Sequence, residues 1–353
     1  MSQPRKYKRL IEQGLSYNPL TVESCSMPTI LRAFAKINIG LRIGPRRDDG
    51  FHELRTVYQT VELHDVIRVQ AARGIGIEIR CNRPEVPLDE TNTCWRVAER
   101  VLKILKRRAK ITITITKNLP VQGGLGAGSS NAVATMLALE KELEQSLEAA
   151  QRVEIAAAVG SDVPLFLVGG TILGIGRGEQ VFPLVEMPSM PCVIATPAIS
   201  VSTPKAFKDW DEKFDSTSHV ANSKLTEKSA SGTIKKFSTS VFTWLMGTTA
   251  GVPAKSGDRG ETPLLDLVRA GIENDFERVV FPQYPELRDV KRVLEREGAK
   301  YASLSGSGSS VYGLFESIEA AEKAAGKLNA NGVAAQATRT ITRREYWKNL
   351  VVG

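Results

Sequence analysis

The sequence has little of what builds a disulfide framework or a metal site. Its 353 residues include only four cysteines and three histidines. The cysteines are far apart and none forms a C-x-x-C pair, so neither a disulfide framework nor a structural zinc site is expected. A reducing, cytoplasmic location suits this composition. The four cysteines are Cys25, Cys81, Cys94 and Cys192.

Long apolar runs are also scarce. The first residues, MSQPRKYKRLIEQG, lack the apolar core of a signal peptide. The longest apolar stretch, residues 155–176, has the length of a membrane span but contains Asp162, Pro164 and five glycines. We therefore expect a buried helix, turn and strand there, and no membrane partner.

Acidic residues are outnumbered, and the net charge of +8 suits an anionic partner without naming it. Nucleotide, RNA and acidic protein surfaces all qualify. The densest basic run, KILKRRAK at residues 103–110, is explained by the solvated face of a helix. Nucleic acid is therefore not expected as a partner, although RNA binding stays open as a minor alternative.

Strand and helix patterns alternate along the chain without the regularity of βαβ units, so the predicted class is α+β. Alternating apolar residues predict a strand over 27–44, and residues 64–81 are typical of a strand pair joined by a glycine-containing turn. Helical spacing follows at 91–108, with Thr91 as the candidate cap. Further strands are expected at 110–116, 170–184, 191–203, 299–315 and 333–341, and further helices at 131–147, 149–160, 266–280, 284–298 and 317–332.

Length and composition divide the chain further. We expect a basic extension over residues 1–26, an N-terminal domain over 27–186 and a C-terminal domain over 187–350. A tract rich in serine, threonine, lysine and glycine, at about 210–262, is typical of an insertion in the second domain.

A glycine-rich loop carries the most specific signal. Residues 123–130, GGLGAGSS, follow a strand and lead into a helix, and they lack only the lysine of the Walker A pattern G-x-x-x-x-G-K-[ST]. Glycines let the backbone approach a ligand, and the N–H groups at a helix start attract anions. Phosphate binding is favoured over a plain strand-to-helix turn.

Two polar positions lie in otherwise apolar stretches. Lys36 and Asn38, in FAKINIGL, share one face of a strand. Taken alone, a solvated edge-strand lysine is the simpler reading. Asp162, in GSDVPLFL, is either a helix cap or a half-buried general base, and the residues alone leave both open.

Two further segments have a structural and a functional interpretation. In RRDDGFHELRT, Asp49-Gly50 marks a turn, and Phe51 and His52 supply an aromatic ring and a hydrogen-bonding ring. His52 could equally be structural. SGSGSS, residues 305–310, is either a hairpin turn or a second phosphate-facing loop.

The segments AKIN, DGFHEL, P-x-x-GGLGAGSSNA, GSDVP and SGSGSSV occur in an order that resembles the GHMP kinase superfamily, over about residues 27–348 apart from the insertion. AKINIGL with DGFHELRTVYQ is the most specific part, and it resembles the branch that acts on a cytidine diphosphate-linked methylerythritol. The resemblance implies an N-terminal domain like ribosomal protein S5 and a ferredoxin-like C-terminal α/β sandwich.

The resemblance also implies an activity, namely ATP-dependent phosphorylation of the substrate's 2-hydroxyl in non-mevalonate isoprenoid precursor biosynthesis. Asp162 would take the hydroxyl proton and Lys36 would assist it. Mg²⁺ is expected, with Ser130 as the best candidate ligand, in a monomer or weak homodimer. The implied ATP-binding residues are Pro120, Gly123, Gly124, Leu125, Gly126, Ala127, Gly128, Ser129, Ser130 and Asn92. The implied substrate-binding residues are Asn38, Phe51, His52, Phe207, Gly306, Ser307 and Gly308.

Two departures from the family pattern stand out. Phe51 replaces a frequent tyrosine, which keeps stacking on the cytosine opposite Phe207 and removes one polar contact. Gln122 replaces a usually small residue beside the glycine loop. The competing functions are a homoserine or mevalonate type of kinase, for which His52 and Phe207 would not be needed, and a catalytically silent ATP-binding protein.

Overall fold

The computed structural model of the chain describes residues 27–121, 123–214 and 272–352. The predicted extension over 1–26, Gln122 and the insertion beyond residue 214 lie outside the described residues. Within them, no helix is long and apolar enough to cross a membrane.

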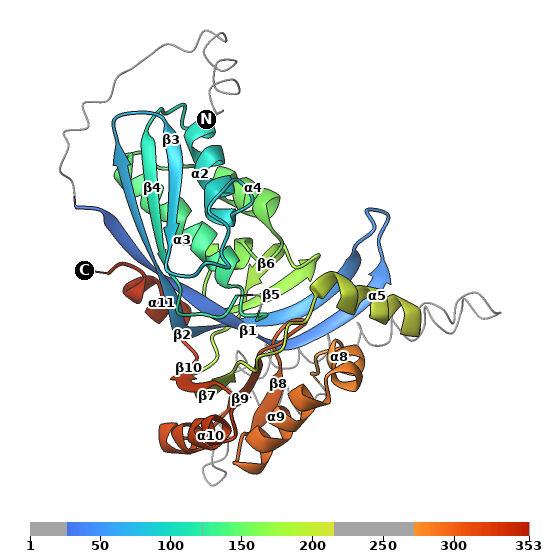
Figure 1. Cartoon of the computed structure of the whole chain (residues 1–353). Helices are drawn as coiled ribbons and strands as arrows, with labels where there is room; N and C mark the ends of the chain where they lie inside the picture. Colours follow the sequence, from blue (N-terminus) through green and yellow to red (C-terminus); the bar gives the residue numbers. More distant parts are fainter. Residues whose placement is uncertain (1–26, 122, 215–271, 353) are drawn as a thin grey trace, which may run out of the picture.

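The first half of the chain builds a six-stranded sheet in the order β3-β4-β2-β5-β6, with β1 on the other edge of β2 (Figure 1). β2 is long enough to pair with β1 along one edge and, along the other, with β5 at one end and β4 at the other. β1 and β2 carry three register shifts, which bend this ribbon. The strands are β1 Thr29–Arg46, β2 His52–Ala72, β3 Gly76–Cys81, β4 Lys110–Thr116, β5 Thr171–Gly176 and β6 Gln180–Pro183.

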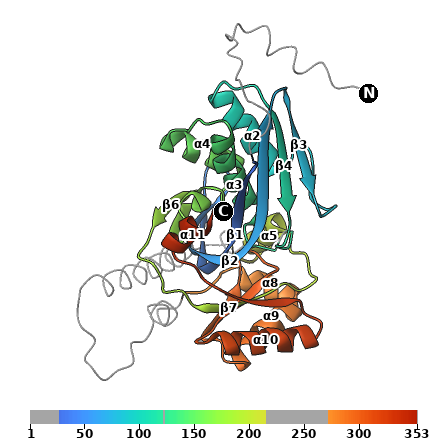
Figure 2. The ribbon, with the colours of Figure 1, turned by 90° about the vertical axis from the view of Figure 1, so that its left-hand side faces the viewer.

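Three helices cover one face of this sheet: α2 Thr93–Ile104, α3 Ala127–Glu142 and α4 Ala149–Val159 (Figure 2). The short 3-10 helix η1, Pro164–Leu167, follows α4. α3 is apolar or small around most of its circumference, and the main core cluster encloses it between the sheet and its neighbours. The glycine loop is therefore attached to one of the most deeply buried helices of the molecule.

The second half forms a four-stranded antiparallel sheet in the order β10-β7-β9-β8. Its element order, strand–helices–strand–strand–helix–strand, and its strand order are those of a ferredoxin-like sandwich. The strands are β7 Pro191–Ala195, β8 Tyr301–Leu304, β9 Val311–Leu314 and β10 Ala335–Arg339. The helices are α5 Thr203–Phe214, α8 Glu277–Gln283, α9 Pro285–Arg296 and α10 Ile318–Ala330, and α9 and α10 cover the outer face (Figure 1).

The two sheets share an apolar layer. Alternate residues of β1, namely Ala35, Ile37 and Ile39, pack with Ile194 of β7 and Tyr312 of β9. Because side chains alternate along a strand, Lys36 and Asn38 point away from this layer. Of these two, Lys36 lies beside the glycine loop, where a Cβ on Gly126 would lie 3.1 Å from its Cγ.

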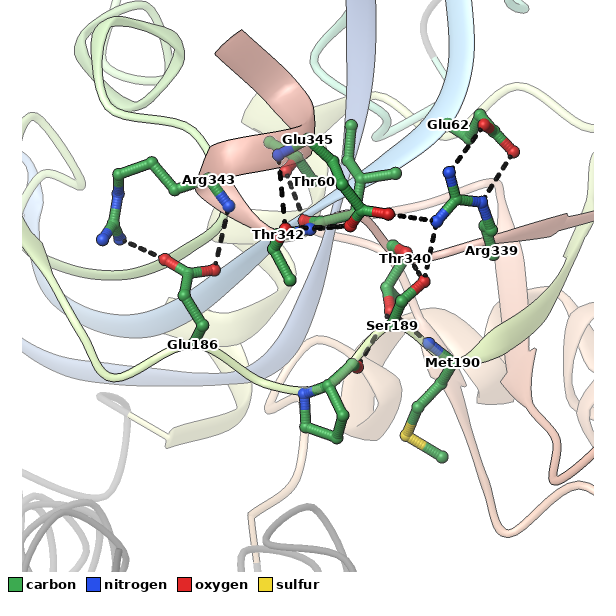
Figure 3. A network of polar contacts seen from close by, with 12 residues as sticks. Thr60, Glu62, Glu186, Ser189, Met190, Arg339, Thr340, Thr342, Arg343 and Glu345 are labelled. Carbon is green, nitrogen blue, oxygen red and sulfur yellow. Dashed lines mark hydrogen bonds and ion pairs between the residues drawn. The ribbon is translucent and has the colours of Figure 1, made fainter. Parts of the chain in front are cut away.

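A polar network also ties the end of the chain to both sheets. Arg339, at the end of β10, pairs with Glu62 of β2 and with Glu345 of the last helix, α11 Arg343–Asn349 (Figure 3). Arg343 pairs with Glu186 in the segment that leads to β7. α11 inserts Tyr346 into the first sheet's core, so the final residues return to the first half of the fold. The division into 27–186 and 187–350 stays a prediction.

Most predicted elements are confirmed, and the α+β class with them. The two strands and the glycine-containing turn expected at 64–81 are confirmed, but their pairing is wrong, because β4 lies between β2 and β3. The cap of α2 is Asn92 instead of Thr91. α3 begins at Ala127, inside the glycine loop, and ends at Glu142. Of the predicted 266–280 helix, residues 266–271 lie outside the described residues, and in the remainder the helix begins only at Glu277. The sequence patterns did not predict α5, α11 or the start of β2 at His52.

Candidate active site

Lys36 and Asn38 form a buried polar row on β1. Lys36 is only 2% exposed, and its Nζ donates to Asn38 Oδ1 at 2.7 Å. The Asn38 amide donates to Thr56 Oγ1 at 2.8 Å, and that hydroxyl donates to the Gly40 carbonyl at 2.7 Å. Lys36 is therefore fixed by its neighbours, which excludes the solvated edge-strand lysine considered from the sequence.

Asp162 lies in the turn between α4 and η1 and meets Lys36 from the other side. Its Oδ2 lies 3.3 Å from Lys36 Nζ, and its Oδ1 accepts a 3.1 Å hydrogen bond from Tyr58. The N-cap of η1 is Val163, without a side-chain cap bond, so Asp162 does not cap that helix. Its side chain is 35% exposed, which leaves one flank of the carboxylate open to a reactant.

Lys36 and Tyr58 are buried on the inner side of Asp162. The Lys36 ammonium lies 5.5 Å from the centre of the Tyr58 ring, an attractive arrangement for a cation. Burial, followed by the negative charge of Asp162, raises the pKa of Tyr58 well above its ordinary value. The phenol thus stays protonated at neutral pH and donates to the carboxylate.

The glycine loop approaches Lys36 through its backbone. The Lys36 N–H donates to the Leu125 carbonyl at 3.0 Å, and a Cβ on Gly126 would lie 3.1 Å from Lys36 Cγ. Gly126 is the N-cap of α3, with φ +69, a conformation that favours glycine. The next residues form the first turn of α3, and their backbone N–H groups have no acceptor within the helix. The loop therefore presents backbone donors near the Lys36–Asp162 pair.

The serine-rich β8–β9 loop, residues 305–310, interlocks with the glycine loop. Ser310 N donates to the Gly123 carbonyl at 3.1 Å, and Ser305 Oγ donates to the Gly124 carbonyl at 2.9 Å. A Cβ on Gly306 would lie 3.6 Å from Lys36 Nζ, so this loop also borders the polar row. Its hairpin interpretation is confirmed, since β8 and β9 pair directly.

Two buried hydroxyls beside the glycine loop, those of Ser130 and Ser310, have no hydrogen-bond partner among the described residues, and Ser130 is the predicted metal ligand. The Ser130 Oγ is buried in the first turn of α3.

The remaining residues of the glycine loop pack against the fold. The Gly128 carbonyl accepts a hydrogen bond from Thr93 at 2.7 Å, which links the loop to α2. Pro120 packs close to Gly123, where an added Cβ would lie 2.9 Å from its ring. Leu125 is buried in the layer between the sheets.

The other end of the site is aromatic. His52 Nδ1 lies 2.9 Å from the Gly44 carbonyl oxygen, and its Nε2 lies 2.7 Å from Asp211 Oδ1 on α5. The Phe207 ring stacks on His52 with the centroids 5.5 Å apart and the planes at 7°. Phe51, 53% exposed, lies under the Arg177 guanidinium at 5.0 Å. The two phenylalanines thus occupy different surroundings.

The two ends are joined along β2. His52 and Thr56 share one strand four residues apart, and a strand rises about 3.3 Å per residue, so their backbones lie about 13 Å apart. Thr203, at the start of α5, bonds Ser307 of the serine-rich loop through their hydroxyls at 2.7 Å. The site is elongated, with a stacking end and a charged end.

Several residues of the site were not predicted. Tyr58, Asp211 and Arg177 contact predicted residues, and Asn274 donates to the Gly306 carbonyl at 2.7 Å. Tyr58 lies within the DGFHELRTVYQ segment, but no role was expected for it, and Asp211, Arg177 and Asn274 stand in no recognisable motif. The predicted ATP contact of Asn92 has a structural competitor, because its amide already caps α2 and donates to Pro87.

Sequence comparison decides the family. The chain is 38% identical to the 4-diphosphocytidyl-2-C-methyl-D-erythritol kinase of Solibacter usitatus, over 81% of this chain and 80% of that protein. It is 33% identical to the enzyme of the same name from Geobacter sulfurreducens, over 88% of this chain and 98% of that protein. The chain belongs to the 4-diphosphocytidyl-2-C-methyl-D-erythritol kinase family. It is an ATP-dependent small-molecule kinase.

Further comparisons agree with this family. Residues 92–170 match the GHMP kinases N terminal domain and residues 262–334 the GHMP kinases C terminal domain. A crystal structure of a 4-(cytidine 5'-diphospho)-2C-methyl-D-erythritol kinase superposes with a TM-score of 0.65 and 27% identity, covering 88% of this chain and 98% of that one. Homoserine kinase from Cytophaga hutchinsonii shares the fold. It is 20% identical and superposes with a TM-score of 0.64, covering 92% of this chain and 98% of that one.

Proposed function

We propose that this kinase transfers the γ-phosphoryl group of ATP to the 2-hydroxyl of 4-diphosphocytidyl-2-C-methyl-D-erythritol, in non-mevalonate isoprenoid precursor biosynthesis. The observation that carries the proposal is the Lys36–Asp162 pair, set beside two interlocked glycine-containing loops and joined by β2 to the stack of His52 and Phe207. A long nucleoside diphosphate ester would contact both ends of this site, with its base at the stacking end and its hydroxyl at the charged end. The family membership supports the same substrate.

In this mechanism Asp162 accepts the proton of the hydroxyl as its oxygen attacks the γ-phosphorus and the bond to the ADP oxygen breaks. Lys36 holds the carboxylate and offsets the negative charge that develops on the transferred group. The backbone donors at the start of α3 bind the phosphates of ATP. Because the transition state is loose, positioning and electrostatics supply most of the acceleration.

The aromatic end would bind the cytosine. Phe207 is already stacked on His52, and α5 carries both Phe207 and the Asp211 carboxylate beside that histidine. In this proposal the base stacks between Phe207 and Phe51, with the Arg177 guanidinium next to the more exposed ring. Asn38 and residues 306–308 border the remainder of the substrate.

The Ser130 oxygen beside the glycine loop suits a magnesium ion that the nucleotide would carry. Among the described residues no cluster of three or more acidic, histidine or cysteine side chains could hold a metal. Ser130 Oγ is buried and unpartnered in that part of the chain, so it can supply one oxygen ligand. Phosphate oxygens would supply others, and bound Mg²⁺ would neutralise charge on the phosphates.

A phosphotransfer panel tests the proposal. Purified protein with ATP and Mg²⁺ is offered the cytidyl substrate, homoserine and mevalonate, and the products are followed by ³¹P NMR. We expect phosphorylation of the cytidyl compound alone. Asp162→Asn should lower kcat by about 10²- to 10⁴-fold. Turnover of homoserine or mevalonate without the cytidyl compound would refute the substrate, and near wild-type kcat in Asp162→Asn would refute the general base.

A further inference from the structure

Tyr58 contacts the proposed base directly but has no role in the mechanism above. It lies in the middle of β2, between Asn38 on β1 and Ile172 on β5, and its side chain is 2% exposed. Its hydroxyl donates to Asp162 Oδ1 at 3.1 Å, while Lys36 Nζ lies 3.3 Å from Oδ2. The two oxygens of the carboxylate are thus held by different donors.

The fold makes room for this ring at two glycines of the β5–β6 hairpin. A Cβ on Gly174 would lie 2.5 Å from Tyr58 Cε2, and a Cβ on Gly178 would lie 2.5 Å from the Tyr58 hydroxyl. Real Cβ atoms do not approach that closely, so any larger residue at either position would displace the ring. Gly178 also has φ +99, which a side chain would strain. The position of the phenol is therefore set by its neighbours.

Asp162 itself lies in a short turn, and its side chain is partly exposed. A carboxylate held by one donor can rotate about that contact, whereas a second donor on the other oxygen fixes its plane. We propose that Tyr58 is a positioning residue that orients the Asp162 carboxylate toward the acceptor hydroxyl. This inference rests on the proposed function, since it assigns a reason for the orientation of the base.

The phenol acts as donor only. Burial raises its pKa well above the ordinary value, so it stays protonated throughout the neutral range and does not compete with Asp162 for the proton of the substrate. Replacing the hydroxyl by hydrogen keeps the ring, its packing against Gly174 and its contact with Lys36, and it relieves the close approach at Gly178. Tyr58→Phe is thus a clean perturbation.

The test is a double-mutant cycle with Asp162→Asn. Tyr58→Phe should lower kcat about 10- to 100-fold and leave both KM values within about twofold, since a misplaced group costs up to about 100-fold. In the Asp162→Asn background the same substitution should change kcat less than about twofold. Tyr301→Phe is the matched control, because that buried hydroxyl bonds the Ile39 carbonyl at 2.8 Å; we expect its kcat to stay near wild type.

Each outcome decides the inference. Wild-type kcat in Tyr58→Phe, an equal loss in both backgrounds, or raised KM values with unchanged kcat would overturn it. If wild-type protein does not phosphorylate the cytidyl substrate, the proposed function is refuted, but the positioning role of Tyr58 is not. Crystal structures of wild type and Tyr58→Phe then test that role separately. An Asp162 carboxylate that keeps its orientation in the Tyr58→Phe structure contradicts the positioning role, whereas a rotated carboxylate supports it.

Discussion

Gly124→Ala should damage the junction of the two loops. Gly124 has φ +75, and an added Cβ would lie 2.1 Å from the Ser305 carbonyl oxygen and 3.1 Å from that of Gly308. Both obstacles are backbone atoms, which cannot rotate away as a flexible side chain would. The methyl group must therefore push the serine-rich loop off the glycine loop or change the conformation of both.

The magnitude has two parts. An L-residue in the left-handed region costs about 1–2 kcal/mol, and overpacking in a well-packed place costs about 1–3 kcal/mol. We expect the free energy of unfolding to fall by about 2–5 kcal/mol in Gly124→Ala, the sum of these ranges. The KM for ATP should rise as well, because the displaced loop carries the proposed phosphate donors.

Urea unfolding followed by fluorescence measures the first effect, and initial rates at varied ATP measure the second. Gly326→Ala is the matched control. Gly326 lies within α10, and nothing stands within 4 Å of an added Cβ, so alanine should stabilise that helix by about 0.5–1 kcal/mol. Equal unfolding midpoints for wild type and Gly124→Ala would refute the reasoning, since neither the left-handed φ nor the contact would then be costing free energy.

Two other predictions concern buried charge and buried thiols. Lys117→Met removes the ammonium that pairs with the fully buried Asp65 and should lower the free energy of unfolding by about 3–5 kcal/mol in urea; a loss under about 1 kcal/mol would contradict this. Burial raises the pKa of Cys94 to about 12 and raises that of Cys192 as well, so among the three cysteines that the structure describes iodoacetamide at pH 8 should label Cys81 before Cys94 and Cys192. Peptide mass spectrometry checks this, and equal labelling of Cys94 in the native protein would contradict it.

The strands and helices could largely be predicted because their signals are local. Alternation over residues 110–116 and helical spacing over 284–298 each reflect one buried face, whereas the strand predicted at 27–44 is buried on both faces from residue 33 onward. Strand pairing is not local. The turn at residues 73–75 suggested that its two flanking strands are neighbours, yet β4 lies between them and pairs with both. Nothing within residues 64–81 carries that information.

The site was predictable to the extent that its residues fall in motifs. The glycine loop has its own composition signal, whereas the partnership of Lys36 with Asp162 was implied only by family resemblance, since the two come from distant elements. Tyr58 and Asp211 were missed for the same reason: each acts through a partner supplied by another strand or helix. An isolated tyrosine or aspartate in a sequence does not indicate such a partner.

The interlocked loops also explain why both sheets are needed at one reaction centre. Lys36 and Asp162 belong to the first half of the chain, and Gly306, beside Lys36, belongs to the second. Ser305 and Ser310 hold this approach through carbonyls of the glycine loop. A shift between the sheets would separate these groups, and the apolar layer and the Arg339 network resist it at two other places. Substitutions in that network should therefore alter the kinetics of both substrates, although no residue of the network lies in the proposed site.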